Sequence, residues 1–180
     1  MIISGRASGS PVFNKGEYSM CVSDPFDYQV LNLSPMFYSD YPETKYVELM
    51  RKQDRPYNCL LIQSHYGYFI CIPYRTEINH KYAYKFKKSK RSKKHKSGLD
   101  YSKIVIVQKK EYLENFDAVV DRDEFKETRD NIEYIRKDAQ EYIDDYVNQI
   151  SGSLQKYDEK EFQRIYNYST LQYFHKELGI

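Results

Sequence analysis

Two apolar runs joined by a polar turn form the clearest pattern along the chain. Residues 55–63 (RPYNCLLIQ) and 68–74 (YFICIPY) carry consecutive apolar side chains, and Gly67 between them can adopt a positive φ. This pattern is typical of a β-hairpin. We predict that its second strand ends near Pro73, because proline cannot donate a ladder hydrogen bond. A third short strand is predicted over Lys103–Gln108 (KIVIVQ), which is rich in β-branched residues.

Helical periodicity dominates the C-terminal part of the chain. Apolar side chains recur at three- and four-residue steps through residues 121–150, and this spacing predicts one long amphipathic helix. Asp121 is placed to cap its first turn, and Gly152 is placed to end it. A less regular pattern predicts a terminal helix over residues 155–178.

The N-terminal region shows little periodicity. Residues 1–35 are punctuated by Gly, Ser and Pro, and we expect an irregular arm ahead of a single domain over residues 36–180. A short helix is predicted near residues 42–50, with Pro42 in its first turn. Strands followed by helices indicate an α+β fold.

Composition narrows the class of protein. The chain has three cysteines, no C-x-x-C motif and no zinc-type spacing, so we expect buried free thiols, no structural metal and no cofactor. It has neither a signal-peptide pattern nor an apolar run near the roughly 20 residues of a membrane span, which indicates a cytosolic protein. The 20 Tyr and absence of Trp suit stacking on bases, but an AT-rich genome would favour Tyr and Lys equally.

Charge is strongly segregated along the chain. Nine Lys or Arg residues and no acidic residue lie between Lys81 and Lys96, whereas Glu111–Gln149 holds 13 acidic and five basic residues. A basic patch on an acidic body favours a polyanion ligand. The first part of the basic segment has a strand-like alternation, and residues 79–98 are predicted to form a charged connection. The simpler alternative is a solvated loop that binds polyanions nonspecifically.

Residues able to cut RNA without a metal gather near the predicted strand ends. Such cleavage needs a group that deprotonates the ribose 2′-OH, cations that stabilise the phosphate, and a proton for the leaving 5′ oxygen. The candidate catalytic residues are Arg55, Arg75, Thr76, His80 and Lys103. A hairpin brings the start of one strand beside the end of the next, so Arg55 is expected near Arg75 and Thr76. His80 comes within reach if residues 77–80 turn helical.

Each of these residues also has a purely structural interpretation. Thr76 can cap a following turn, and His80 can be an exposed loop residue or a supporting partner. The alternative ion-pair partners are Asp54 for Arg55, Glu77 for Arg75 and Asp100 for Lys103.

Four short blocks in order resemble the TenpIN branch of ToxN-like toxins. They are Lys52 with Asp54–Tyr57, an apolar strand, Ile72–His80, and Gly98–Lys103 before a β-branched strand. The resemblance covers about residues 36–150. It implies an endoribonuclease toxin of a type III toxin–antitoxin system, one that acts in phage defence. It also implies a strongly twisted antiparallel sheet, an SH3-like small barrel related to the MazF/Kid fold, with a long C-terminal helix and further helices.

The resemblance also implies partners and a surface for them. The partners are the substrate RNA and a small repetitive antitoxin RNA that folds into pseudoknots, fills the active-site groove and assembles with the toxin into closed hetero-oligomers. The Pro-x-[Ser/Thr] pattern of those folds falls on Pro73 and Thr76 with one extra residue between them, so the group that activates the 2′-OH stays open. The predicted RNA-binding residues are Lys52, Tyr57, Lys85, Lys87, Lys88, Lys90, Arg91, Lys93 and Lys94.

Three other functions fit the same sequence. A noncatalytic RNA-binding module would keep the basic segment and use the arginines structurally. A protein–protein adaptor would dock through the predicted helix over residues 121–150. A MazF-like toxin would pair with a protein antitoxin.

Overall fold

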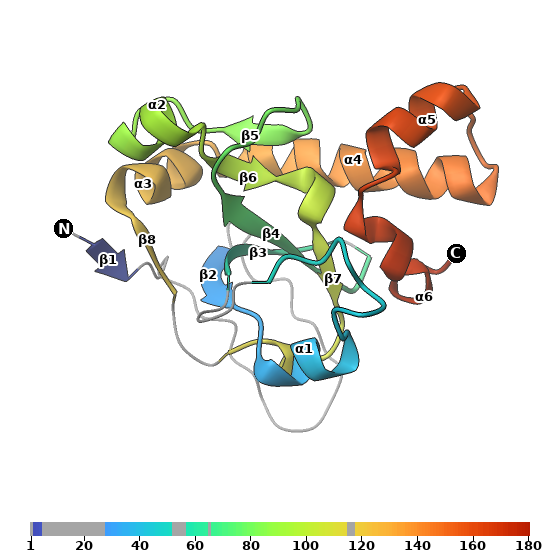
Figure 1. Cartoon of the computed structure of the whole chain (residues 1–180), viewed down its shortest axis with the longest axis horizontal. Coiled ribbons are helices and arrows are strands. Elements are labelled where there is room, and N and C mark those ends of the chain that lie inside the picture. The colour runs from blue at the N-terminus through green and yellow to red at the C-terminus, as the bar shows by residue number, and fades with distance from the viewer. Residues whose placement is uncertain (1, 5–27, 52–56, 65, 115–117) are drawn as a thin grey trace.

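An antiparallel sheet of six strands is the centre of the fold (Figure 1). The computed structural model describes residues 2–4, 28–51, 57–64, 66–114 and 118–180. The strands follow the order β2-β3-β4-β6-β5, and β7 pairs with β4 alongside this path. These strands are β2 (Tyr28–Asn32), β3 (Asn58–Gln63), β4 (Phe69–Arg75), β5 (Ala83–Lys85), β6 (Gly98–Asp100) and β7 (Val105–Val107). A separate antiparallel pair joins β1 (Ile2–Ser4) to β8 (Val119–Asp121).

Helices surround this sheet, with α4 running behind it and α5 and α6 at one end (Figure 1). The α-helices are α1 (Pro35–Asp40), α2 (Lys90–His95), α3 (Arg122–Asp130), α4 (Ile132–Ser151), α5 (Glu159–Tyr166) and α6 (His175–Leu178). The 3-10 turns are η1 (Tyr101–Lys103), η2 (Lys110–Tyr112) and η3 (Thr170–Tyr173). None of the helices in the described part of the chain combines the length and apolar character needed to cross a membrane.

The predicted hairpin is confirmed, but its second strand is longer than expected. β3 pairs antiparallel with β4, and Gly67 in the turn has a φ of 84°. The prediction that the strand ends near Pro73 is wrong, since β4 continues to Arg75. The reason is a gap in the ladder: β7 pairs with β4 only as far as Cys71, and β6 begins its pairing at Tyr74. Pro73 therefore lies where no N–H donor is required on that side.

The α+β class is confirmed, whereas closure into a small barrel is not seen. β2 and β5 end the strand path, and among the described residues no pairing joins them. β2 also corrects the predicted N-terminal arm, because residues 28–32 form a buried strand beside β3. The predicted third strand is present as β7, within residues 103–108.

The single long helix predicted over residues 121–150 is wrong. Two helices, α3 and α4, meet at Asn131, whose side-chain amide donates to the Glu127 carbonyl over 2.8 Å. Such a side-chain bond to the backbone competes with continuation of the helix. Both predicted ends are confirmed: the Asp121 carboxylate accepts the first amides of α3, and Gly152 ends α4 with a φ of 74°.

Two other helix predictions need correction. Residues 155–178 form α5, η3 and α6 in place of one terminal helix, and Ser169 caps the η3 turn between them. Residues 42–50 form turns, and the short helix lies earlier, at α1. There Pro35 occupies the first turn, and the Ser34 hydroxyl accepts the Phe37 amide.

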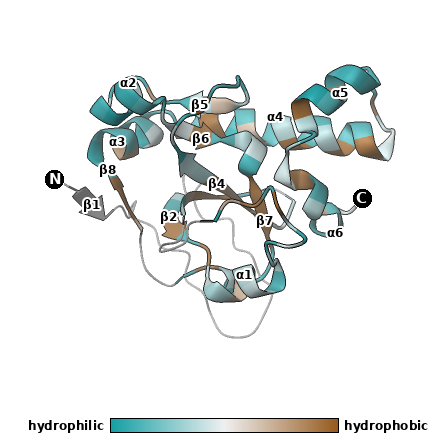
Figure 2. Cartoon of the chain, viewed as in Figure 1, coloured by the Kyte–Doolittle hydropathy of each residue, from teal (hydrophilic) through white to brown (hydrophobic). Residues whose placement is uncertain are grey.

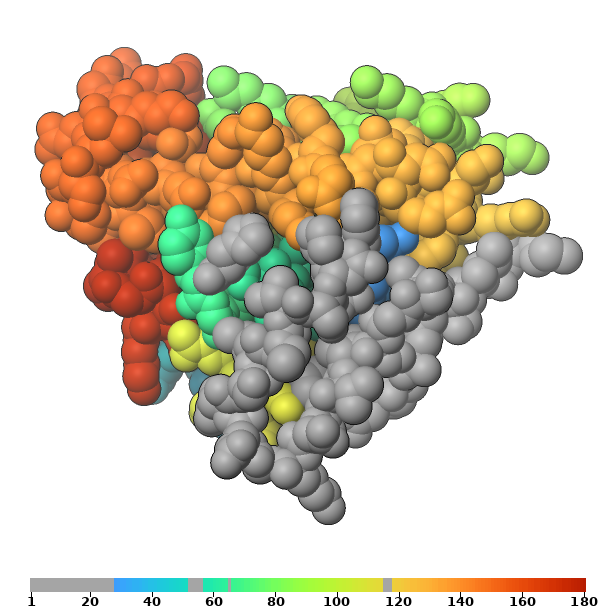
Figure 3. Space-filling view, turned by 180° about the vertical axis from the view of Figure 1, so that it is seen from behind, coloured from blue at the N-terminus to red at the C-terminus, as the bar shows by residue number. Residues whose placement is uncertain are grey.

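Tyrosine rings fill much of the space between the sheet and α4. Tyr142 of α4 lies 4.7 Å from Tyr166 of α5 between ring centroids, and both are buried. Tyr101 beside them is also buried. Much of the tyrosine content therefore builds the core and is not available to stack on bases. Seen from behind, α4 spans the molecule above the sheet (Figure 3). Cys59 and Cys71 are buried free thiols, as predicted.

Candidate active site

A buried carboxylate, that of Asp100, joins two of the predicted catalytic residues. Its side chain has no exposed surface, and Arg75 Nη1 lies 2.6 Å from Oδ2. His80 Nε2 lies 3.3 Å from Oδ1, and the amide and hydroxyl of Ser102 donate to the same oxygen over 3.0 and 2.7 Å. Arg75 and His80, which lie close together along the chain, therefore share one anion that comes from 25 residues beyond Arg75.

The sheet explains why Asp100 lies there. Asp100 is the last residue of β6. Gly98, two residues earlier in the same strand, pairs with Arg75 at the end of β4. The three residues of η1 then interrupt the ladder before β7 resumes it. A Cβ on Gly98 would lie 2.3 Å from the Tyr84 carbonyl oxygen, so the close approach of β5 to β6 requires glycine at this position.

The surroundings of Asp100 keep it ionised. Burial raises its pKa, but the neighbouring His80, Ser102 and Arg75 lower it, and the net pKa lies below the usual value. The charged form is therefore stable at neutral pH. An ionised, buried Asp100 can fix the orientation of the Arg75 and His80 side chains.

Arg75 and His80 keep part of their surface accessible. Their side chains are 36% and 34% exposed. Both ring nitrogens of His80 are buried, and Nδ1 has no hydrogen-bond partner, while the Nε2 contact with Asp100 has an ion-pair distance without hydrogen-bond alignment. The Tyr82 ring stacks on His80 with centroids 6.3 Å apart. A histidine oriented by a carboxylate is suited to proton transfer, and an arginine has further N–H donors for phosphate oxygens.

Lys103 lies beside this group without pairing with Asp100. Its ammonium donates to the Tyr168 carbonyl over 2.8 Å. Burial lowers the pKa of Lys103, Asp100 and Glu48 oppose that effect, and Arg75 adds to it, so that the pKa is lowered overall. The structure thus brings Lys103 into the electrostatic neighbourhood of Arg75 and Asp100.

Thr76 has no contact with Asp100, although it was predicted to share the site. Thr76 directly follows β4, is half-buried, and makes no side-chain hydrogen bond to another described residue. The helical turn expected at residues 77–80 is absent, and Glu77 has a left-handed φ of 58°. Arg55 and Lys52 lie outside the described residues.

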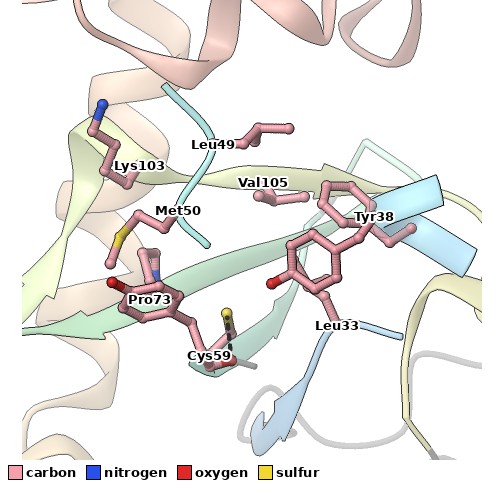
Figure 4. Close-up of a pocket in the computed structure, with 10 residues that line it drawn as sticks. Leu33, Tyr38, Leu49, Met50, Cys59, Pro73, Lys103 and Val105 are labelled. Carbon is pink, nitrogen blue, oxygen red and sulfur yellow. Dashed lines mark hydrogen bonds between the residues drawn. The ribbon is translucent and has the colours of Figure 1, made fainter. Parts of the chain in front are cut away.

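A shallow apolar hollow adjoins Lys103 (Figure 4). It measures about 260 Å³, including space open to solvent. Tyr38, Met50, Tyr57 and Pro73 are among its lining residues, and Lys103 extends from its rim. Tyr57 directly precedes β3 on the hairpin that also carries Arg75. The predicted RNA-binding residue Tyr57 therefore lines a surface that reaches the Asp100 group.

The basic segment is folded, which corrects the expected charged connection over residues 79–98. Its first part is β5, as the alternation suggested, and its second part is helix α2, capped by Ser89 over 2.8 Å to the Ser92 amide. It forms a hydrophilic helix at one end of the molecule (Figure 2).

Two buried glutamates of α3 hold the segment in place. Glu124 accepts from Ser89 over 3.1 Å, from Ser97, and from Arg91 over 3.2 Å. Glu127 accepts the backbone amides of residues 87 and 88 over 3.1 and 3.0 Å. Arg91 is thus engaged in an internal ion pair, unlike the other predicted RNA-binding residues of the segment. Those with exposed side chains are Lys85, Lys87, Lys88, Lys90, Lys93 and Lys94.

Sequence reasoning missed the importance of Asp100, Glu124 and Glu127. Asp100 was considered only as a partner of Lys103. A usable signal was its position as the one acidic residue in the apolar stretch before KIVIVQ, followed two residues later by Ser102. The two glutamates stand among many exposed acids of residues 121–150 and carry no comparable signal.

Comparisons with protein-family models, with curated proteins and with solved structures give no match for this chain. The family and its activity therefore stay predictions.

Proposed function

We propose that the chain is an endoribonuclease whose reaction centre is the group formed by Arg75, His80, Asp100 and Lys103. The observation that carries this proposal is the shared buried carboxylate: Arg75 and His80 contact the same Asp100 at 2.6 and 3.3 Å. A paired histidine and arginine beside a lysine of lowered pKa supply proton transfer and anion binding together. The resemblance to ToxN-like toxins points to the same reaction.

The proposed reaction is an intramolecular transesterification that cleaves the RNA backbone. The 2′ oxygen attacks the phosphorus and forms the 2′,3′-cyclic phosphate, while the bond to the 5′ oxygen breaks. Nδ1 of His80, the ring nitrogen that does not face Asp100 and that RNA binding must expose, accepts the 2′-OH proton. A water molecule gives the leaving 5′ oxygen the proton that makes it a 5′-OH. Arg75 and Lys103 stabilise the charge on the phosphate oxygens in the transition state. Asp100 orients His80 and Arg75 and does not contact the RNA.

The basic segment would hold the rest of the RNA. Six exposed lysines on and beside α2 can contact phosphates, and neutralising phosphates releases counterions. Tyr57, an aromatic residue that lines the hollow beside Lys103, would contact an unpaired base there. These features favour single-stranded RNA that lies across the hollow and continues towards α2.

The biological role that we propose is that of the toxin in a type III toxin–antitoxin system. A repetitive antitoxin RNA would occupy the same surface as the substrate, so that inhibition is competition for one site. This part rests on the resemblance over residues 36–150, including the finer assignment of a fold related to the MazF/Kid toxins.

Mapping of RNA ends tests the proposal. The chain is expressed from an inducible promoter beside His80→Ala and Arg75→Ala variants, and new 5′-hydroxyl ends are mapped across the transcriptome. Arg164→Ala is the matched control, because Arg164 is exposed and, among the described residues, pairs with Glu161 alone, one helical turn away and 3.5 Å distant. We expect new ends at a recurrent short motif with the unaltered chain and the control, and their loss in the two site variants.

Two outcomes would change the interpretation. New ends in every strain would keep the enzyme and move its centre away from Asp100. No new ends from folded protein that still binds RNA would favour the noncatalytic RNA-binding module, in which the ion pairs of Asp100 are structural.

A further inference from the structure

The segment that carries His80 is attached to the end of the basic helix. The Glu77 amide donates to the His95 carbonyl over 2.7 Å, and the Ile78 amide donates to the Lys96 carbonyl over 3.2 Å. Ile78 is fully buried, which pins the middle of the segment. The segment between β4 and His80 therefore takes its position from α2 as well as from the sheet.

Side chains reinforce this attachment on both sides of Ile78. Lys96 Nζ donates to Asn79 Oδ1 over 2.9 Å, and His95 Nδ1 lies 3.3 Å from Glu77 Oε1. Asn79 directly precedes His80, so the Lys96 bond acts next to the proposed acid–base residue. One ammonium of the basic segment is thus directed to the protein itself.

The backbone is held in an unfavourable conformation at one residue of each joined segment, Glu77 after β4 and Lys96 after α2. Glu77 and Lys96 have φ values of 58° and 47°, and they are the non-glycine residues with positive φ in the described chain. Such conformations cost energy and persist where surrounding contacts hold them. They lie opposite each other, joined through the hydrogen bonds of Glu77 and Ile78.

We propose that Lys96 is a positioning residue for His80, acting through Asn79, and that it does not belong to the lysines that hold RNA. This inference rests on the proposed endoribonuclease function. It divides the basic segment into two roles, since Lys94, two residues earlier, is exposed and its side chain forms no hydrogen bond or ion pair with the described part of the chain. Lys94 binds phosphate, whereas Lys96 sets the geometry of proton transfer.

The matched pair Lys96→Met and Lys94→Met tests this division. Each change removes one charge from the same end of the segment, and methionine keeps an unbranched side chain. Cleavage is measured with an end-labelled RNA that carries a site mapped with the unaltered protein. We expect Lys96→Met to lower kcat about tenfold with KM nearly unchanged, because misplacing a catalytic group by about 1 Å can cost up to about 100-fold in rate. Lys94→Met should raise KM and leave kcat near its original value.

Three further readouts separate positioning from general damage. Asn79→Ala should reproduce the loss of kcat, and combining it with Lys96→Met should add little, because both remove the same bond. Lys96→Arg should restore most of kcat, since it keeps a cationic donor. In a His80→Ala background, Lys94→Met should reduce the salt dependence of RNA binding, while Lys96→Met should not.

The outcomes distinguish a failure of the positioning role of Lys96 from a failure of the proposed endoribonuclease function. If Lys96→Met raises KM and spares kcat as Lys94→Met does, Lys96 is a phosphate contact and the inference is wrong, although the enzyme stands. Full kcat in Asn79→Ala would overturn it equally. If the unaltered protein cleaves no RNA, the proposed function fails, and the positioning role fails with it.

Discussion

Replacing Asp100 with asparagine is the most direct perturbation of the candidate site. Asparagine has nearly the same shape and keeps an oxygen that can accept the two bonds from Ser102. It removes the negative charge and presents an amide N–H to either Arg75 or His80. Arg75, now 2.6 Å from Oδ2, would face either a weaker acceptor or a second donor.

The expected cost follows from these contacts. A hydrogen bond to a charged group contributes about 1.5–3 kcal/mol, and solvent screening reduces this for partners that are about a third exposed. We therefore expect a loss of about 2 kcal/mol in the free energy of unfolding, with the Ser102 bonds retained. For a chain of this size that corresponds to a fall of about 4–8 °C in Tm. Cleavage should fall by about 100-fold, because His80 and Arg75 lose their common orienting group.

Thermal unfolding and RNA cleavage of the same preparation measure both effects. Asp130→Asn is the control, since Asp130 is an exposed aspartate that pairs with the adjacent Arg129. Its Tm should change by less than about 2 °C, as expected for a surface ion pair. An Asp100→Asn protein with unchanged Tm and full cleavage would refute the central place given to this carboxylate. Lost stability with full cleavage would leave Asp100 as a structural residue only.

Three further predictions concern the stability and local opening of the fold. The pKa of Asp100 is lowered in the folded protein, so its contribution to stability is present above about pH 4 and is lost as the pH falls through the folded-state pKa. When unfolding is measured against pH, the free energy of unfolding should therefore fall less below about pH 4 in Asp100→Asn than in the unaltered chain. Gly98→Ala should lower the free energy of unfolding, measured with denaturant, by about 3 kcal/mol or more, because the added Cβ would meet backbone atoms. Gly152→Ala should lower it by about 1 kcal/mol, because Gly152 has open space around it and a φ of 74°. Equal losses would contradict the close packing of β5 and β6. Glu124→Gln should speed amide hydrogen exchange in residues 89–96 at least tenfold, because it weakens the bonds that hold α2; unchanged exchange would show that α2 is held by other contacts.

Local features of the chain were readable from sequence because their causes are local. The hairpin follows from two apolar runs and Gly67, and the ends of the helical region follow from Asp121 and Gly152. Each depends on residues within a few positions of one another, so the propensity of the segment decides the outcome. The approach of His80 to Arg75 has a different cause from the one expected: residues 77–80 form no helical turn, and both side chains meet at Asp100.

Errors arose where a distant partner overrode the local pattern. Pro73 did not end its strand, because the two strands on that side of β4 leave a gap opposite it. The long apolar stripe did not give one helix, because Asn131 bonds back to the chain and α3 turns its glutamates towards the basic segment. The basic segment became a helix because buried carboxylates neutralise and anchor it.

The sequence by itself determined the class of chemistry that is available: two arginines, a histidine, a hydroxyl and a lysine near strand ends, followed by a dense run of lysines. Tertiary structure alone decided how these groups are used. It placed Asp100 between Arg75 and His80, set Lys103 apart on the Tyr168 carbonyl, and bound Lys96 to Asn79. The physical reason is that a buried charge such as Asp100 must find its partners wherever the fold brings them, and Arg75 lies 25 residues away from it along the chain.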